Sequence, residues 1–548
     1  MRTTARAVRV RGRFIPVIVI GALLALGAVQ QDGRSGGFTL SPELPYDVDR
    51  ARVGELVRKG DIPDAHRLFD DFAWRTFIAL NWPANANGQP DPAKTPADSA
   101  TSRVWEFYRE SGTVFLQDGQ RPAPWEGSRQ WVSAASEARE GDAPARQLWM
   151  QAKGDPEPQA HPRLEESIQA FTGPLVDQNG KWVRYEVLMN RTEFDYLYEH
   201  QLYSLEGQIA FTANTMVDFP ANDGNGRHGA MEVKLAWKQL GANDDPKRFL
   251  VREALVSHMI ADASGKFVSS KPTLETMGLV GMHIAVKTRS APTWVWSTFE
   301  HVDNVAANDL EKDSRGRRIR PLFFNPDLPV KPVNVLAAKN AAPDGKGNFT
   351  SWSEPLTTSP TQVLRVLQIA PATAELNREV REALRNANSV FQYYELIGTQ
   401  WPVQPGFPAF GGGVMAGPDG QSISSAPESI VFKTPGKVTP TYLINTIMET
   451  FFQSGNQVAG PLMEDDRLPA GQVSDPNTVF GTESCVGCHF SAGAAVGFKV
   501  DQNGQELVDA SGYRVPVFGK NASMGRTGNA DYSWLLQMRA KSAPVKKQ

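Results

Sequence analysis

Two stretches of this chain repeat apolar residues every three or four positions, which is the spacing of a helix that buries one face. The first stretch covers residues 64–82, and Pro83 ends it. The second covers residues 371–396 and is closed by Pro402. His66 lies in the first turn of the first helix, where we expect a solvated or capping role. Both helices flank a region with a different pattern.

Residues 125–310 show the pattern of short strands. Residues 174–187 predict a hairpin around an Asn-Gly turn. Residues 231–237 alternate, so that apolar side chains share one face of the strand and polar side chains share the other. Two further strands are expected over 279–287 and 293–303, joined by a short turn that favours an antiparallel pair. The pattern therefore predicts a β-rich central domain.

The first 28 residues have the pattern of a secretory signal. Five arginines and no acidic residue precede the apolar run from Phe14 to Ala28, and small residues at its end suit cleavage. The run of about 15 residues is shorter than the roughly 20 that a bilayer span needs. We expect export to the periplasm, with an uncleaved anchor as the alternative and no transmembrane span beyond it.

Composition describes an ordinary globular protein. Apolar residues make up 41% of the 548 residues and charged residues 21%, which is usual for soluble domains. The formal net charge is −3, and no basic tract is interleaved with aromatic residues, so we expect no nucleic-acid partner. The length predicts two or three domains.

The strongest chemical signal is Cys485-Val-Gly-Cys488-His489, near the C-terminus. Cys-x-x-Cys-His is the attachment signature of c-type haem, in which the two thiols bond to the porphyrin vinyl groups and the histidine binds the iron. Cys485 and Cys488 are the only cysteines of the chain. A structural zinc site needs about four ligands and has no second pair here. A redox dithiol is the other alternative, and it does not require His489.

The region around this motif suggests a small cytochrome c fold, in which two helices pack around the haem and a loop methionine binds the iron. Helices are expected over 440–453 and 531–540. Met524 lies in a glycine-flanked loop after the motif and is the candidate sixth ligand. The motif follows its expected first helix by some 30 residues, which departs from the usual arrangement.

A second group of polar residues occupies strand positions of the β-rich region. Its members are Lys234, His283, Glu300, His301 and Asp303. His283 and His301 are the candidate catalytic residues of this group. The alternative is that both histidines have structural partners, as buried polar groups usually do.

Three stretches of the chain carry a resemblance to a known family: 229–237, 278–284 and 294–304. Together with the haem motif and the residues from Asp531 to Leu536, they resemble the exported bacterial proteins called cytochrome c family proteins. The resemblance covers most of the chain from about residue 65. It implies a single covalent haem c and a periplasmic location, and no substrate is established for that family.

These observations favour a periplasmic monohaem c-type cytochrome that transfers electrons to or from a redox partner protein. With Met524 and His489 as axial ligands, the iron would have no open position. The alternative is a haem-dependent oxidoreductase of peroxidase or oxygenase type, with a substrate site on the β-rich domain. A third possibility is that this domain only docks a partner.

The expected fold class is α+β, with a β-rich central domain, flanking helices and a small, mainly α-helical, cytochrome c-like haem region at the C-terminus. The expected domains are a signal peptide at 1–28, an N-terminal helix and loops at 29–124, the β-rich domain at 125–310, a linker and long helix at 311–439, and the haem domain at 440–548.

Overall fold

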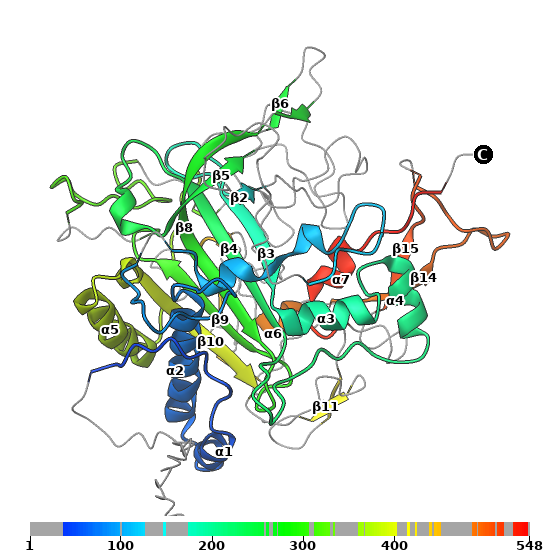
Figure 1. Cartoon of the computed structure of the whole chain (residues 1–548), viewed down its shortest axis with the longest axis horizontal. Helices are drawn as coiled ribbons and strands as arrows, with labels where there is room; N and C mark the ends of the chain where they lie inside the picture. Colours follow the sequence, from blue (N-terminus) through cyan, green and yellow to red (C-terminus); the bar gives the residue numbers. More distant parts are fainter. Residues whose placement is uncertain are drawn as a thin grey trace, which may run out of the picture. The chain divides into compact units, whose positions relative to one another are not determined.

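Alternating apolar and polar residues build one large sheet at the centre of this chain (Figure 1). Its strand order is β1-β3-β4-β8-β9-β10-β13, with β5 beside β8 and β2 beside β5, and every pair except β2–β5 is antiparallel. The computed structural model describes residues 37–98, 101–125, 146–148, 174–256, 259–261, 267–270, 272–305, 312–328, 333–334, 360–365, 368–402, 414–416, 422–424, 438–440, 443–450, 485–489, 492–509, 512–519 and 530–545.

The strands of this sheet are β1 Arg109–Glu110, β2 Arg146–Leu148, β3 Arg184–Met189, β4 Met231–Gln239, β5 Val251–Val256, β8 Thr273–Val286, β9 Val295–His301, β10 Tyr394–Pro402 and β13 Val438–Thr439. Three small sheets pair β6 Met259–Ala261 with β7 Phe267–Ser269, β11 Val414–Ala416 with β12 Ser422–Ser424, and β14 Ala495–Phe498 with β15 Pro516–Phe518. The helices are α1 Arg50–Arg58, α2 Ile62–Leu80, α3 Arg191–Glu199, α4 Leu205–Thr212, α5 Pro371–Asn386, α6 Cys485–His489 and α7 Trp534–Arg539, and the short 3₁₀ helices are η1 Val104–Phe107, η2 Ser111–Thr113, η4 Pro246–Arg248 and η5 Val390–Tyr393.

One face of the sheet is covered by α2 and α5, which lie beside β9 and β10 in Figure 1. Phe77 of α2 stacks on Phe299 of β9 with ring centroids 4.2 Å apart. Trp74 of α2 donates a hydrogen bond to Asn377 of α5, 2.9 Å long. The aromatic contacts and the buried hydrogen bond hold the two helices against the sheet.

The opposite face of the sheet carries α3, α4, α6 and α7. A second apolar cluster joins these four helices to β8 and β9. Phe194 of α3, Leu205 of α4, Val486 of α6 and Leu536 of α7 are its buried members on the helices. Because residues alternate along a strand, this face receives Trp296 while the other face receives Phe299. The motif helix α6 therefore lies on the face that α2 and α5 do not cover.

The expected α+β class is confirmed, and several expected elements are present. The helix expected at 64–82 is α2, and the strand expected at 231–237 is β4. The strands expected at 279–287 and 293–303 are β8 and β9, and they pair antiparallel.

The helix expected over 371–396 is wrong beyond Asn386. Asn388 takes a positive φ of 53°, and the amide of Ser389 donates to the carbonyl of Leu384, which ends the helix. Of the apolar residues that seemed to continue it, Phe391 belongs to η5, and Tyr394 and Leu396 belong to β10; all three join the core that α2 and α5 cover. This misassigned stretch therefore completes the sheet.

The helix expected over 440–453 is absent from its described part, residues 443–450. The side-chain oxygen of Asn445 accepts from the amides of Ile447 and Met448, at 2.9 and 3.2 Å. Such side-chain bonds compete with the backbone hydrogen bonds of a helix. The amide of Thr446 also donates outside the segment, to the carboxylate of Glu300. The segment forms turns that lie across the sheet.

The C-terminal part holds short elements in the residues that are described. They are α6, the β14–β15 hairpin and α7, and the helix expected at 531–540 begins only at Trp534. The signal expected at 1–28 lies outside the described residues. Within the described part of the chain, every helix is too short or too polar to cross a membrane.

Candidate functional site

The motif helix α6 is fastened to the sheet by a buried glutamine. The amide of Val486 donates to Oε1 of Gln400 in β10, at 2.8 Å. The Nε2 group of Gln400 donates to the carbonyl of Pro440, at 2.7 Å. One side chain therefore satisfies a helix amide and a loop carbonyl, and it fixes α6 over the end of β10.

His489 ends α6 and is held by a second fixed contact. Its Nδ1 lies 2.7 Å from the carbonyl oxygen of Tyr532. A carbonyl can only accept, so Nδ1 carries the hydrogen and the neutral ring keeps its lone pair on Nε2. The ring also packs against Trp296 of β9, with centroids 4.3 Å apart. This is the tautomer in which Nε2 can bind a metal.

The imidazole of His489 is neutral at ordinary pH. Its pKa is lowered to about 4, mainly by burial and also by the nearby side chains of His283 and Lys234. The hydrogen bond with Tyr532 and the charge of Glu449 act in the opposite direction and are outweighed. A neutral imidazole is the form that a metal ion requires.

The carbonyl of Tyr532 is held in place by an unusual backbone turn. Asp531 and Tyr532 have positive φ angles of 49° and 69°, which few non-glycine residues adopt. The carboxylate of Asp531 anchors the turn, because it accepts from Lys287 Nζ at 2.5 Å and from the amide of Phe219 at 2.6 Å. The turn aims a backbone acceptor at His489.

The two cysteines of the motif lie one helical turn apart. Cys485 and Cys488 are the first and the fourth residue of this short helix. Cys485 is partly buried, and its sulfur lies 3.8 Å from the carbonyl oxygen of Leu443. The side chain of Cys488 lies outside the described part. The described side chains of the motif fit a covalently bound haem: the thiol of Cys485 and, in the same short helix, a histidine whose Nδ1 is occupied and whose Nε2 carries the lone pair.

His283 shares the face of α6 and is paired with a carboxylate. It stands on β8, opposite Lys234 of β4 and Thr298 of β9 in the register. Its Nε2 lies 2.7 Å from Oε1 of Glu449. The other carboxylate oxygen of Glu449 accepts from the amide of Asn445, at 2.9 Å. The turn at 443–450 therefore brings Glu449 onto the sheet beside His283.

Glu449 is ionised. Burial alone would raise its pKa, but the charge and hydrogen bond of His283, the charge of Lys234 and the amide of Asn445 hold the pKa below its usual value. The carboxylate is thus an acceptor for the Nε2–H of His283, and Nδ1 of His283 has no partner among the described residues.

His301 has a structural role on the opposite face. It is buried against Phe249, with ring centroids 4.4 Å apart, and its Nε2 lies 2.9 Å from the carbonyl of Arg248. Burial lowers its pKa. Beside it, Asp303 accepts two hydrogen bonds from Arg248, each 2.7 Å long. The structure therefore separates His301 and Asp303 from His283 and His489.

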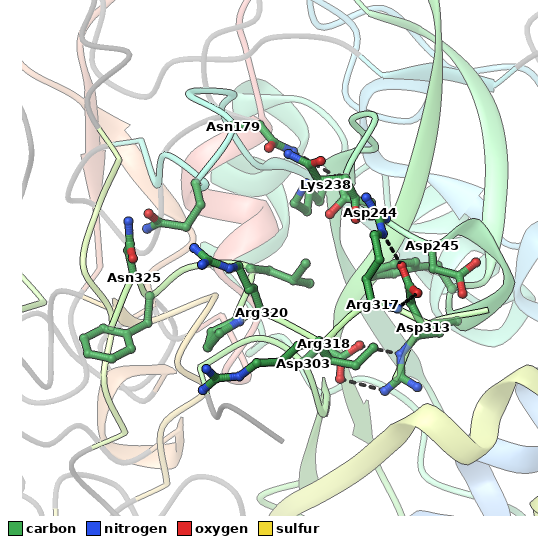
Figure 2. A pocket seen from close by; sticks show the side chains of 18 of the residues that line it. Asn179, Lys238, Asp244, Asp245, Asp303, Asp313, Arg317, Arg318, Arg320 and Asn325 are labelled. Carbon is green, nitrogen blue, oxygen red and sulfur yellow. Dashed lines mark hydrogen bonds and ion pairs between the residues drawn. The ribbon is translucent and has the colours of Figure 1, made fainter. Parts of the chain in front are cut away.

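A polar cavity of about 500 Å³ lies between the end of β4 and residues 313–326 (Figure 2). Several of its charged side chains are already paired: Lys238 bonds to Asp244 at 2.6 Å, and Arg317 bonds to Asp313 at 2.7 Å. None of its lining residues is one of those that contact α6. The cavity is separate from the motif.

Sequence analysis identified Cys485, Cys488, His489 and His283 but missed three residues that position them. Sequence patterns did not single out Gln400, Tyr532 and Glu449, because each makes its contact with a segment that is distant in the sequence. Met524 lies outside the described residues. No group of three or more His, Cys, Asp or Glu side chains in the described part is arranged to hold a bare metal ion.

Comparison with known proteins finds no family model, no curated protein and no solved structure that matches this chain.

Proposed function

We propose that this chain is a monohaem c-type cytochrome that works in the periplasm and transfers electrons to or from a redox partner protein. One observation carries the proposal: His489 donates its Nδ1–H to the carbonyl of Tyr532 and so offers Nε2 to iron. Histidines that bind metals almost always donate their second ring N–H to a carbonyl or carboxylate in this way.

The chain's residues would hold the group as follows. Cys485 and Cys488 would form the thioether bonds, and His489 would bind the iron through Nε2. Gln400 and Trp296 position α6 and the His489 ring. When bound, the haem supplies a one-electron couple at its iron. Residues 440–548 would form the haem region together with the sheet face beneath them.

The location and the partner follow from the same chemistry. In bacteria, c-type haem is attached outside the cytoplasmic membrane, which agrees with the signal expected at 1–28. A carrier of one electron needs a donor and an acceptor, so a redox partner protein is part of the proposal. No feature of the sequence favours nucleic acid as a partner.

A haem-dependent oxidoreductase is the second candidate function, and one observation favours it. His283 and Glu449 form a 2.7 Å titratable pair on the face that carries His489. Such pairs serve acid–base chemistry. The two functions differ at the sixth ligand: Met524 on the iron would close the site and suit electron transfer alone.

The double variant Cys485→Ala, Cys488→Ala tests the proposal. Without the two thiols no thioether can form, so haem staining of the denatured protein in a gel should disappear completely. His228→Ala, which removes an imidazole away from the motif, should keep full staining. Staining that survives loss of both cysteines would refute covalent attachment at this motif.

A further inference from the structure

We propose that the polar cavity between the end of β4 and residues 313–326 is a binding site for a small polyhydroxylated molecule that carries an acidic group, of the class of sugar acids and sugar phosphates. The acidic group would bind to Arg320, and the hydroxyl groups would bind to the carboxamides of the cavity wall. This site is separate from the motif at 485–489 and does not depend on the proposed haem.

The cavity has the size of a small-molecule site. Its volume is about 500 Å³, and ligand pockets of proteins measure roughly 300–1,000 Å³. Its walls come from segments that are distant in the sequence: the turn at 178–179, residues between 238 and 249, Asp303 and the loop 313–326. Figure 2 shows Asn179 and Lys238 on the side of the cavity opposite Asp303 and Arg318. The space therefore suits a ligand of this size.

The inner wall is fixed before any ligand arrives. Lys238 is almost fully buried and binds the carboxylates of Asp177 and Asp244, at 2.9 and 2.6 Å. Arg248 donates two hydrogen bonds to Asp303, each 2.7 Å long. Because these charges neutralise one another, the inner wall positions a ligand without selecting its charge. A preformed wall also reduces the entropy that is lost when a ligand binds.

The outer wall carries an excess of positive charge. The loop 313–326 brings one carboxylate to the cavity, that of Asp313, and three arginines, which are Arg317, Arg318 and Arg320. All three arginines are exposed. Asp313 is bonded to Arg317, at 2.7 Å. This side of the cavity therefore favours a ligand with negative charge.

Arg320 is the residue best placed to bind the acidic group. In the described part of the chain its ion-pair partner is Asp327, 2.9 Å away, and the two side chains are 68% and 60% exposed. An exposed ion pair contributes little to stability, so the guanidinium can exchange Asp327 for a ligand with little loss. A planar guanidinium matches a carboxylate or a phosphate with two parallel hydrogen bonds.

The carboxamides and an aromatic ring of the wall suit the rest of such a molecule. A carboxamide both donates to and accepts from hydroxyl groups, and four line the cavity: Gln178, Asn179, Asn243 and Asn325. The Oδ1 atom of Asn325 accepts from the amide of Asp327 at 3.0 Å, which leaves its Nδ2 group without a protein acceptor among the described residues. Phe324 is partly buried, and its ring offers a flat apolar surface to the C–H face of a sugar.

A bare cation fits this cavity poorly. Every carboxylate that lines it accepts a hydrogen bond from the protein; these residues are Asp244, Asp245, Asp303 and Asp313. A cation would have to displace those donors, and the arginines of the loop 313–326 would repel it. An acidic ligand adds a partner to the arginines and takes none from the aspartates.

The test measures binding to the full-length protein by titration calorimetry. The probes are glucuronate, glucose 6-phosphate, glucose and inorganic phosphate. At least one of the two acidic sugars should bind about 10-fold more tightly than glucose and than phosphate, because it uses Arg320 and the carboxamides together. The acidic sugar that binds more tightly identifies the acidic group as a carboxylate or a phosphate.

Three variants locate the acidic group. Arg320→Ala should weaken binding of the acidic sugar by about 10-fold and so remove its advantage over glucose. Asp327→Ala removes the competing carboxylate and should bind the acidic sugar at least as tightly as the wild type does. Arg191→Ala is the matched control, since Arg191 forms an exposed pair with Asp195 and does not line the cavity, and it should leave binding unchanged. Each substitution changes only an exposed ion pair, so all three variants should fold.

Four results contradict the proposed site. Failure of both acidic sugars to bind at about 10 mM would exclude a site of this class. Equal affinity for glucose and the acidic sugars, or an Arg320→Ala variant that binds like the wild type, would exclude the role of Arg320. Inorganic phosphate that binds as tightly as both acidic sugars would indicate a simple anion site without contacts to hydroxyl groups. None of these results bears on haem staining, so the proposed cytochrome function is tested separately.

Discussion

His283 and His301 stand on neighbouring antiparallel strands but face opposite sides of the sheet. Residues that pair across two strands share a face, and His283 pairs with Thr298. His301 is three positions further along β9, so the two-residue period turns it to the other face. There it packs on Phe249, while His283 meets Glu449. Identical side chains thus have a structural role in one case and a place beside the motif in the other.

Asp303→Ala should destabilise the fold strongly because it leaves Arg248 buried without its carboxylate. Breaking a buried ion pair typically costs about 3–5 kcal/mol. Denaturant unfolding measures this loss. Asp327→Ala is the control, since Asp327 and Arg320 form an exposed pair whose loss should cost at most about 1 kcal/mol. A similar loss in both variants would contradict a special role of the buried pair.

At the scale of elements, α6 depends on others for its position. A five-residue helix is too short to be stable by itself. Val486 packs into the apolar cluster of α3, α4 and α7, and its amide is bound by Gln400. The helix is therefore placed by its contacts with β10 and with the Tyr532 turn.

Gln400→Leu should loosen α6 because it leaves the buried amide of Val486 without an acceptor. An unsatisfied buried donor costs about 1–3 kcal/mol. Hydrogen exchange at the Val486 amide should become faster, and the unfolding free energy should fall by that amount. Gln368→Leu, at an exposed position, should change neither. Unchanged protection of Val486 in Gln400→Leu would show that another contact holds α6.

At the scale of the whole molecule, the fold buries several acidic side chains close to one another beside the sheet. The carboxyl groups of Glu193 in α3 and Glu232 in β4 lie close enough to affect each other's pKa, and Asp531 lies near them. Burial raises the pKa of Glu193 well above 4.5, and the charges of Glu232 and Asp531 raise it further. Burial raises the pKa of Asp531 to about 7 against the opposing charge of Lys287. Segments far apart in the sequence create this cluster.

These raised pKa values predict lower stability at higher pH. The folded state keeps protons that the unfolded state has lost above pH 4.5, the ordinary pKa of a glutamate. The unfolding free energy therefore falls as pH rises from that value toward the folded pKa. Glu193→Gln removes one such group, and its amide can donate to Glu232.

The measurement is the thermal midpoint between pH 5 and pH 8. In the wild type it should decrease over this range, and in Glu193→Gln it should decrease less. At pH 8 the variant should be more stable by roughly 1 kcal/mol, the size of one hydrogen bond. Glu379→Gln, at an exposed position, should follow the wild type. Equal slopes in all three proteins would refute the assignment.

The sequence by itself determined features that depend on local pattern. The period of apolar residues gave α2, β4, β8 and β9, because burial on one face of a helix or strand leaves a periodic trace. The spacing of Cys485, Cys488 and His489 gave the candidate haem motif, because a short turn must present all three groups. Local pattern failed at residues 387–396, where the apolar residues of η5 and β10 continued the helical spacing of α5.

Only the tertiary structure decided what surrounds the motif. Gln400, Tyr532 and Glu449 reach α6 or its sheet face from segments that are between 40 and 166 residues away from their partners. Such contacts leave no periodic trace, since they depend on how strands pair and on which face each side chain emerges. The side-chain bonds of Asn445 turn the chain at 443–450, and that turn places Glu449 beside His283. Sheet pairing and this turn therefore decided which polar residues lie beside His489.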